Sequence, residues 1–211
     1  MASVRFIDVQ SRPTEFLDFT SLTLDEFQHL VPPFETAFQA HMAAWRLDGK
    51  PRTARQFAVY KNCPLPTPEE RLFFILVYLK TYALQVVQGR LFGMGQSKAN
   101  QWIHMLLPAL LAALRALGDA PARSLTALAQ RLGVSEADAA TVVAPLEEKL
   151  ANQALHHRRL RIEHVNSSVK RCRIVKDRIR LWKAGVRDLV MELCCALHNF
   201  RVRLNPWLPM I

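Results

Sequence analysis

The strongest constraint on the fold is a run of eight apolar residues, 72–79, inside a helix-forming segment. Thr67 can cap this helix, Pro68 suits its first position, and Glu69 and Glu70 favour its first turn. A helix that is apolar on nearly all sides cannot face water on any of them. We therefore expect residues 68–80 to form the buried helix of their domain.

The bulk properties of the chain favour a protein that binds a polyanion. Its 211 residues are enough for one or two domains, and 50% of them are hydrophobic. A net charge of +10 favours nucleic acid or an anionic membrane surface as a partner. The longest apolar runs, 72–79 and 105–114, are shorter than the roughly 20 residues that span a membrane. We expect a cytoplasmic protein without a signal peptide, whose four cysteines are reduced.

The amino-terminal part of the chain predicts helices ahead of the apolar run. Residues 1–21 are expected to be irregular. Thr23 and Glu26 fit a capping box, so a helix should begin there. Two prolines at positions 32 and 33 should interrupt it, and a second helix should run over residues 34–45.

A turn signal at residues 48–51 (DGKP) predicts a small β-hairpin. Its strands would be residues 44–47 and 55–60. Basic side chains lie on or near its tip, and these are Lys50, Arg52 and Arg55. The pattern fits a solvated turn and a phosphate-contacting wing equally well.

Residues 83–117 have the pattern of a helix-turn-helix. A short helix over 83–92 is followed by a glycine turn at 93–95 and a longer helix from 96 to about 117, in which Pro108 should introduce a kink. In such motifs the first residues of the second helix reach base edges, where Gln and Asn pair with adenine and Lys with guanine or phosphate. The candidate readers are Gln96, Ser97, Lys98, Asn100 and Gln101. The pattern alone fits a plain helical hairpin equally well.

Beyond a short linker, residues 124–140 contain a second helix-turn-helix-like phrase, LAQRLGVS. Ser135 can cap its second helix, which should extend to about residue 146. The phrase fits either a second small DNA-contact unit or a compact helical pair, and we interpret it as the helical pair.

The carboxy-terminal part of the chain concentrates the positive charge. Residues 156–187 contain eleven Lys or Arg and two acids, a net charge of +9. Ile162, Val165, Val169 and Cys172 are spaced as one helix face. Glu163 lies beside that face, and by chemistry alone this segment is an amphipathic helix with an exposed carboxylate. A last amphipathic helix should cover residues 184–202.

Several motifs resemble bacterial insertion-sequence transposases that carry an amino-terminal helix-turn-helix and a DDE, RNase-H-like endonuclease domain. The phrases LDGKPR (47–52), YKNCPLP (60–66), ERLFFIL (70–76) and FGMGQSKANQWI (92–103) resemble the helix-turn-helix domain, over residues 22–118. RRLRIEH (158–164) and KRCRIVKDR (170–178) resemble the last catalytic motif.

The resemblance implies roles for particular residues. Glu163 would be the third metal-binding carboxylate, which holds Mg²⁺ or Mn²⁺ only where the site is complete. The basic residues expected to contact DNA are Arg158, Arg159, Arg161, Lys170, Arg171, Arg173, Lys176 and Arg178. The two aspartate phrases that the family carries on its sheet are missing from the sequence. Asp119, in a linker, and Asp138, in a helix, lack the strand context of those phrases.

The sequence thus predicts a mainly α protein with one small β-hairpin and no RNase-H sheet. Its parts are an irregular segment (1–21), the helix-turn-helix domain (22–118), a helical linker (119–148) and a remnant of the endonuclease domain (149–211). We expect an internally deleted, inactive transposase that docks on double-stranded DNA in the bacterial nucleoid and needs no cofactor. It would act alone, as a homo-oligomer or with an intact transposase, and it would not bind a membrane. The alternatives are an active endonuclease using carboxylates from another subunit and a helical interaction protein that does not bind DNA.

Overall fold

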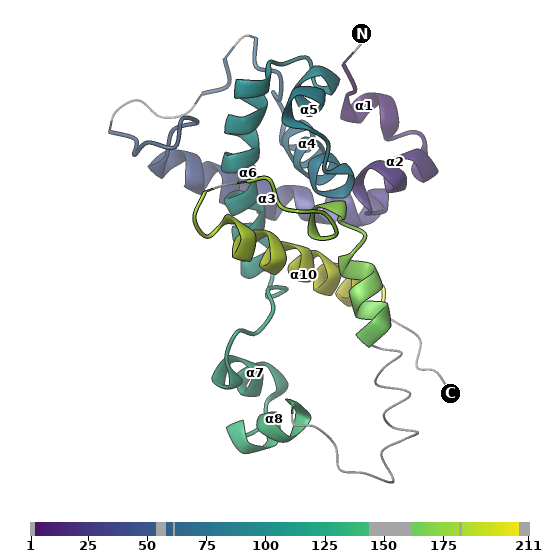
Figure 1. Ribbon diagram of the computed structural model, residues 1–211, viewed down its shortest axis with the longest axis vertical. Coiled ribbons are helices and arrows are strands. Elements are labelled where there is room, and N and C mark those ends of the chain that lie inside the picture. Colours follow the sequence, from purple (N-terminus) through teal and green to yellow (C-terminus); the bar gives the residue numbers. More distant parts are fainter. Residues whose placement is uncertain (1–2, 54–57, 61, 144–161, 182, 207–211) are drawn as a thin grey trace. The chain divides into compact units, whose positions relative to one another are not determined.

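The computed structural model describes residues 3–53, 58–60, 62–143, 162–181 and 183–206 (Figure 1). These described residues form helices and connecting loops, and no strand occurs among them. The chain divides into two compact units. One combines Met1–Ala120 with Val169–Ile211, and the other is Pro121–Ser168. The mainly helical fold predicted from the sequence is confirmed.

Helix α4 (Pro68–Thr81) lies at the centre of the larger unit, as predicted. The Thr67 hydroxyl accepts a hydrogen bond from the Glu70 amide at 3.2 Å, which caps the helix. Every residue from Arg71 to Leu79 is buried. Helices on several sides of α4 provide this burial, including α2 (Pro13–Thr20), α3 (Leu24–Ala44) and α6 (Gln96–Ala116).

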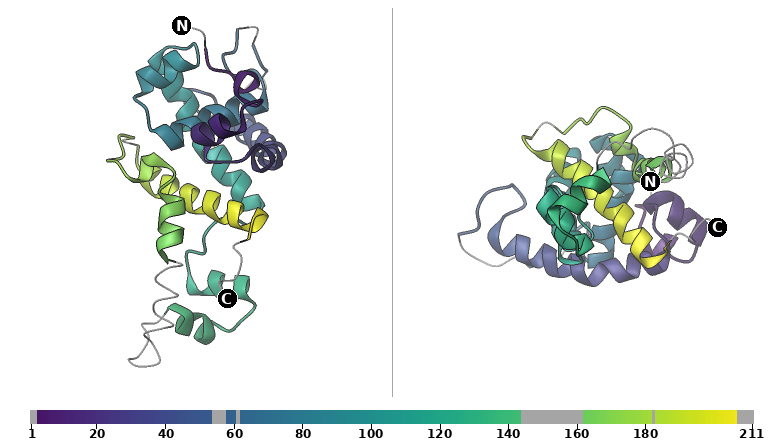
Figure 2. Two further views of the ribbon diagram at one scale, coloured as in Figure 1. Left: turned by 90° about the vertical axis from the view of Figure 1, so that its right-hand side faces the viewer. Right: turned by 90° about the horizontal axis from the view of Figure 1, so that it is seen from below.

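Two further helices complete the larger unit. Helix α5 (Gln85–Leu91) packs against α6. Helix α10 (Val186–Leu204) crosses α6 (Figures 1 and 2). Of the five apolar residues that its helical spacing turns inward, Val186, Val190, Leu193 and Leu197 are buried and Leu189 is half-buried. The predicted helices at 68–80, 83–92, 96–117 and 184–202 are therefore confirmed, with ends shifted by two residues or fewer.

The predicted break at Pro32 and Pro33 is wrong, because α3 runs through both prolines. The capping box at Thr23 and Glu26 is present as predicted. A proline inside a helix costs about 3 kcal/mol, whereas each large apolar side chain that becomes fully buried contributes about 1.5–3 kcal/mol. One continuous helix keeps five such side chains on a single buried face, and these are Phe27, Leu30, Phe34, Phe38 and Met42.

The prediction that residues 1–21 are irregular is wrong. This segment contains α1 (Phe6–Val9) and α2. Pro13 occupies the first turn of α2, and Ser21 ends it with a left-handed φ of 63°. Aromatic packing holds the segment on the core, since the Phe16 ring stacks on Phe73 at 6.0 Å. The Phe6 amide also donates to the Glu70 carboxylate at 3.1 Å.

The predicted β-hairpin is not supported. A single antiparallel bridge joins Trp45 to Pro51, and the described residues around it contain no strand. Helix α3 continues to Ala44, the first residue of the expected first strand, and a turn begins at residue 47, so only Trp45 of that strand is paired. Of the expected second strand, residues 55–57 lie outside the described residues, and residues 58–60 are not in a strand.

The smaller unit contains the predicted helical pair, α7 (Leu125–Leu132) and α8 (Glu136–Val143), which pack together. Ser124 caps α7 by accepting from the Ala127 amide at 3.1 Å. Gly133 ends α7 in the left-handed region, with φ of 67°. Ser135 accepts from the Asp138 amide at 3.2 Å at the start of α8, and the predicted end of α8 near residue 146 lies outside the described residues.

The segment before α10 is helical at residues 162–169 and forms a short 3-10 helix, η1 (Arg173–Val175). Val169 and Cys172 are buried, as the predicted apolar face requires, but Ile162 is 57% exposed. The face therefore becomes a buried one only from Val169 onward. No helix in the described part of the chain is long and apolar enough to cross a membrane.

Candidate nucleic-acid interface

A tight turn at residues 92–95 joins α5 to α6. The Met94 amide donates to the Gly89 carbonyl at 2.8 Å, and Gly93 takes a left-handed φ of 68° that suits glycine. The Phe92 ring is buried edge-on against Phe74 of α4, with the ring centres 4.9 Å apart. The turn is thus fixed both by its own hydrogen bonds and by the core.

Glycine at position 89 allows α5 to approach the turn closely. A Cβ at this position would lie 2.6 Å from the Met94 carbonyl oxygen, well inside van der Waals contact. One residue earlier, the fully buried Gln88 donates its amide to the Phe74 carbonyl at 3.0 Å, which ties α5 to α4. A short helix, a tight glycine turn and a second helix with an exposed start define a helix-turn-helix.

The predicted readers on α6 differ in accessibility. Gln96 and Ser97 are exposed on the first turn, whereas Lys98, Asn100 and Gln101 are half-buried. The Asn100 amide donates to the Gln85 side chain at 2.9 Å and so links α6 to α5. The Lys98 ammonium lies 5.3 Å from the centre of the Tyr60 ring. The two side chains best placed to reach a partner are therefore Gln96 and Ser97.

His104 belongs to the same surface, although the sequence analysis did not select it. It follows Asn100 by four residues and Gln101 by three, so the three side chains share one face of α6. Burial, and then the nearby Lys183 charge, lower the pKa of His104 below its usual value. The imidazole is therefore neutral at pH 7 and can both donate and accept hydrogen bonds. Helical spacing from Asn100 was the signal that could have identified it.

The two basic residues of the 48–52 turn differ in their surroundings. Lys50 is exposed. The Arg52 guanidinium donates to the Met42 carbonyl at 2.6 Å and to the Trp45 carbonyl at 3.2 Å. Arg52 therefore caps the last turn of α3, where free carbonyls and the helix dipole favour a cation.

Residues 156–187 form the basic segment of the chain, and the cations in its described part are exposed. Lys170, Arg171, Arg173, Lys176 and Arg178 are all exposed, and Arg173 pairs with Asp177 at 3.1 Å. Arg158, Arg159 and Arg161 lie outside the described residues.

Arg180 anchors this segment to the end of α4. Its guanidinium carbon lies 4.2 Å from the centre of the Tyr82 ring, its backbone amide donates to the Tyr82 hydroxyl, and its guanidinium donates to the Tyr82 carbonyl. From Val169 onward, the basic segment therefore belongs to the same unit as the helix-turn-helix.

The three carboxylates that the sequence analysis considered, Glu163, Asp119 and Asp138, differ in their surroundings. Glu163 is exposed. Asp119 is buried and accepts two hydrogen bonds from Arg203, both at 2.9 Å, so its charge is already neutralised. Asp138 accepts from the Ser135 hydroxyl at 2.6 Å. Among the described residues, no three His, Cys, Asp or Glu side chains gather in a group that could hold a metal ion.

Comparison with known proteins agrees with the helix-turn-helix geometry. Residues 63–116, about a quarter of the chain, match the family described as the helix-turn-helix of DDE superfamily endonuclease. The match extends from the connector before α4 to the last residue of α6, so it includes the buried helix, the turn and the second helix. No curated protein and no solved structure matches the chain. The match indicates a transposase-related, DNA-binding role for this part of the chain.

The close approach at Gly89 leads to a stability prediction. Gly89→Ala should lower the free energy of unfolding by about 1–3 kcal/mol, because the new methyl group must push the turn away from α5. Urea denaturation followed by circular dichroism measures the change. Gly95→Ser is the control, since Gly95 has φ of −74° at the cap of α6 and nothing within 4 Å of its Cβ position. An equal loss in both variants would contradict the assigned role of Gly89.

Proposed function

We propose that the protein docks on double-stranded DNA through the first turns of α6, as an internally deleted and catalytically inactive transposase of insertion-sequence origin. The observation that carries this proposal is the helix-turn-helix of α5 and α6. It presents Gln96 and Ser97 at the surface and coincides with the family match at residues 63–116.

The chemistry of the α6 surface supports reading of base edges. Gln pairs with adenine through two hydrogen bonds in the major groove, and Ser bonds to any base edge. Gln101 and the neutral His104 extend this hydrogen-bonding surface by two further turns of α6. The groups on α6 that would contact bases are therefore uncharged. Such groups contribute to sequence specificity and add little to the affinity for the phosphate backbone.

The exposed cations of the basic segment supply the complementary contribution. Lys170, Arg171 and Arg173 lie on the same unit as α6 and are open to solvent. Their role would be to contact phosphates, which adds affinity without sequence preference. Base-reading groups on α6 and phosphate-binding cations on the same unit together favour DNA docking. A helical interaction protein that does not bind DNA would need neither.

Catalytic inactivity is proposed from the state of the carboxylates. A DDE endonuclease needs three acids that converge on two metal ions about 4 Å apart. Asp119 is held by Arg203, and Asp138 is engaged with Ser135 at the start of α8. Among the described residues, Glu163 is thus left without the two carboxylates that the reaction requires.

A salt titration tests the DNA-docking proposal. Fluorescence anisotropy should show duplex binding with a micromolar or weaker Kd that weakens steeply with salt. Replacing Lys170, Arg171 and Arg173 together by Gln should reduce the slope of log K against log salt by about 1 per lost phosphate contact. The single variant Arg171→Gln is compared with Arg12→Gln, at the residue that precedes α2, because each change removes one surface charge. An unchanged slope in the triple variant would exclude the basic segment from the interface.

A cleavage assay tests the proposed inactivity. The purified protein should neither nick nor join supercoiled DNA in Mg²⁺ or Mn²⁺, because one carboxylate cannot position two ions. Glu163→Gln should bind DNA as well as the wild type or slightly better, since it removes a negative charge from a basic helix. Metal-dependent nicking by the wild type that disappears in Glu163→Gln would show that other carboxylates, from this chain or a second subunit, complete the site.

A further inference from the structure

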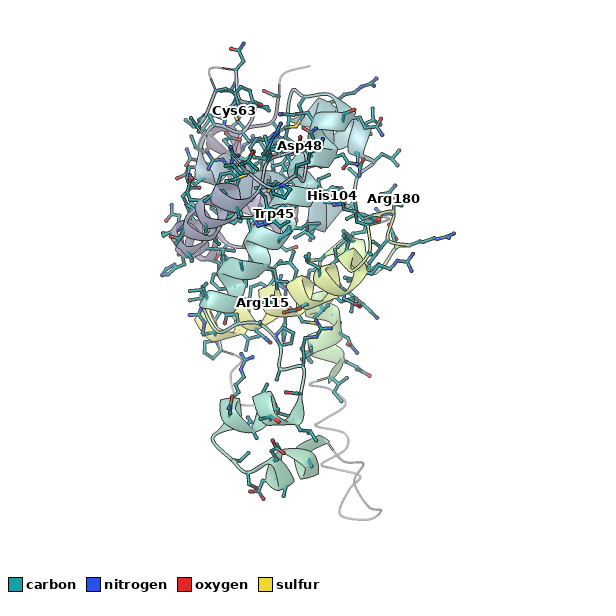
Figure 3. All side chains as sticks on the ribbon, turned by 90° about the vertical axis from the view of Figure 1, so that its left-hand side faces the viewer. Trp45, Asp48, Cys63, His104, Arg115 and Arg180 are labelled. Atoms are coloured by element: carbon teal, nitrogen blue, oxygen red, sulfur yellow. The ribbon has the colours of Figure 1, made fainter. Side chains whose placement is uncertain are left out.

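A hollow of about 410 Å³ lies beside α6, between that helix and the turn that follows α3. Among the residues that line it are Trp45, Asp48, Gln101, His104 and Lys183, and Figure 3 labels three of these, Trp45, Asp48 and His104. Its volume falls within the range of about 300–1,000 Å³ that is usual for small-molecule sites. Gln101 and Asp48 also line a second hollow of about 260 Å³. The base reading proposed above involves Gln101 and His104 on the α6 side of this hollow, but it gives no role to Trp45 or to the space between them.

Trp45 forms one wall of the hollow as a fixed aromatic plane. Its side chain is 42% exposed, although a tryptophan has the largest apolar surface of any residue. Its backbone is held at both ends, because its amide donates to the His41 carbonyl at 2.9 Å and its carbonyl accepts from Arg52 at 3.2 Å. The His41 ring, which also lines the hollow, stacks on the indole with the ring centres 6.4 Å apart and the planes 25° from parallel. The indole is thus exposed but positioned in advance.

The other walls of the hollow provide uncharged hydrogen-bonding groups. Gln101 and His104 come from α6 and are half-buried. Burial lowers the pKa of both His41 and His104, so both rings are neutral at pH 7. Neutral imidazole and amide groups bind the polar edge of a planar heterocycle better than they bind an anion.

Charged groups occupy one side of this hollow. The Lys183 ammonium lies 3.4 Å from the position that a Cβ on Gly49 would take, which places it over the 48–49 turn. Asp48 accepts from the Lys50 amide at 3.2 Å and pairs with Arg46 at 3.4 Å. The Asp48 carboxylate would repel a free phosphate in this hollow. A nucleotide would instead stack its base on Trp45 and place its phosphate near the Lys183 ammonium.

We propose that this hollow binds one unpaired nucleobase of the DNA that α6 contacts, stacked on Trp45 and hydrogen-bonded by Gln101 and His104. This inference rests on the proposed DNA docking and adds a preference for DNA that contains an unpaired base. Stacking on an aromatic side chain is available to every base, so the site selects an unpaired base over a paired one rather than one base over another. Leaving the duplex stack is least unfavourable where a base has no partner.

The test compares a fully paired duplex with the same duplex carrying a one-nucleotide bulge. The wild type should bind the bulged duplex about ten-fold more tightly. 2-Aminopurine placed at the bulge should lose fluorescence on binding, because it stacks on the indole. Trp45→Ala should bind the paired duplex as the wild type does and lose the preference for the bulge, while Trp45→Phe should retain most of it. Met191→Ala, which removes an exposed apolar side chain from α10, is the matched control.

Three outcomes would overturn the inference, and each is distinct from failure of DNA docking. Equal affinity of the wild type for paired and bulged duplexes would remove the preference. A preference kept by a folded Trp45→Ala variant would place the base elsewhere. Trp45-dependent binding of free adenosine monophosphate as tight as that of the bulge would assign the site to a free nucleotide. Binding of neither duplex would contradict DNA docking itself, and this inference with it.

Discussion

The burial of α4 on all sides is the constraint on which the larger unit depends. Every residue from Arg71 to Leu79 is buried, so helices from both ends of the chain must cover it. The one charged side chain in that stretch, Arg71, has a hydrogen-bond acceptor for each of its three guanidinium nitrogens. It donates to Glu35 at 2.8 Å and to the Leu65 and Pro66 carbonyls at 3.3 and 2.9 Å. A buried cation without such partners would be strongly destabilising.

The helix-turn-helix is built directly on this core. Phe74 of α4 supplies a carbonyl to Gln88 of α5 and a ring face to Phe92 in the turn. These contacts hold α5 so close to the turn that any side chain at position 89 would displace the Met94 carbonyl. The exposed start of α6 is therefore positioned by the same residues that stabilise the fold. Packing in the core and geometry at the candidate interface have a common cause.

Sequence patterns predicted the elements whose signals are local. Thr67 with Pro68, and Thr23 with Glu26, marked helix starts that the structure confirms. Predictions failed where distant packing decides the result, as with the continuous α3 through Pro32 and the docking of Phe16 on Phe73. The candidate base-contacting residues of α6 were predicted from their position after a glycine turn. Which of them are exposed could not be predicted from that position. The pocket beside Trp45 could not be predicted, because residues far apart in the sequence form it.

The central claim is that the first turn of α6 lies against DNA. Photo-crosslinking from position 97 tests it most directly, with Ser97 replaced by a benzoyl-phenylalanine and the protein bound to a labelled duplex. The account predicts a protein–DNA crosslink from position 97 and none from the same group at position 191, an exposed position on α10. Crosslinks of equal yield from both positions, or none from position 97 under conditions where the duplex is bound, would contradict it.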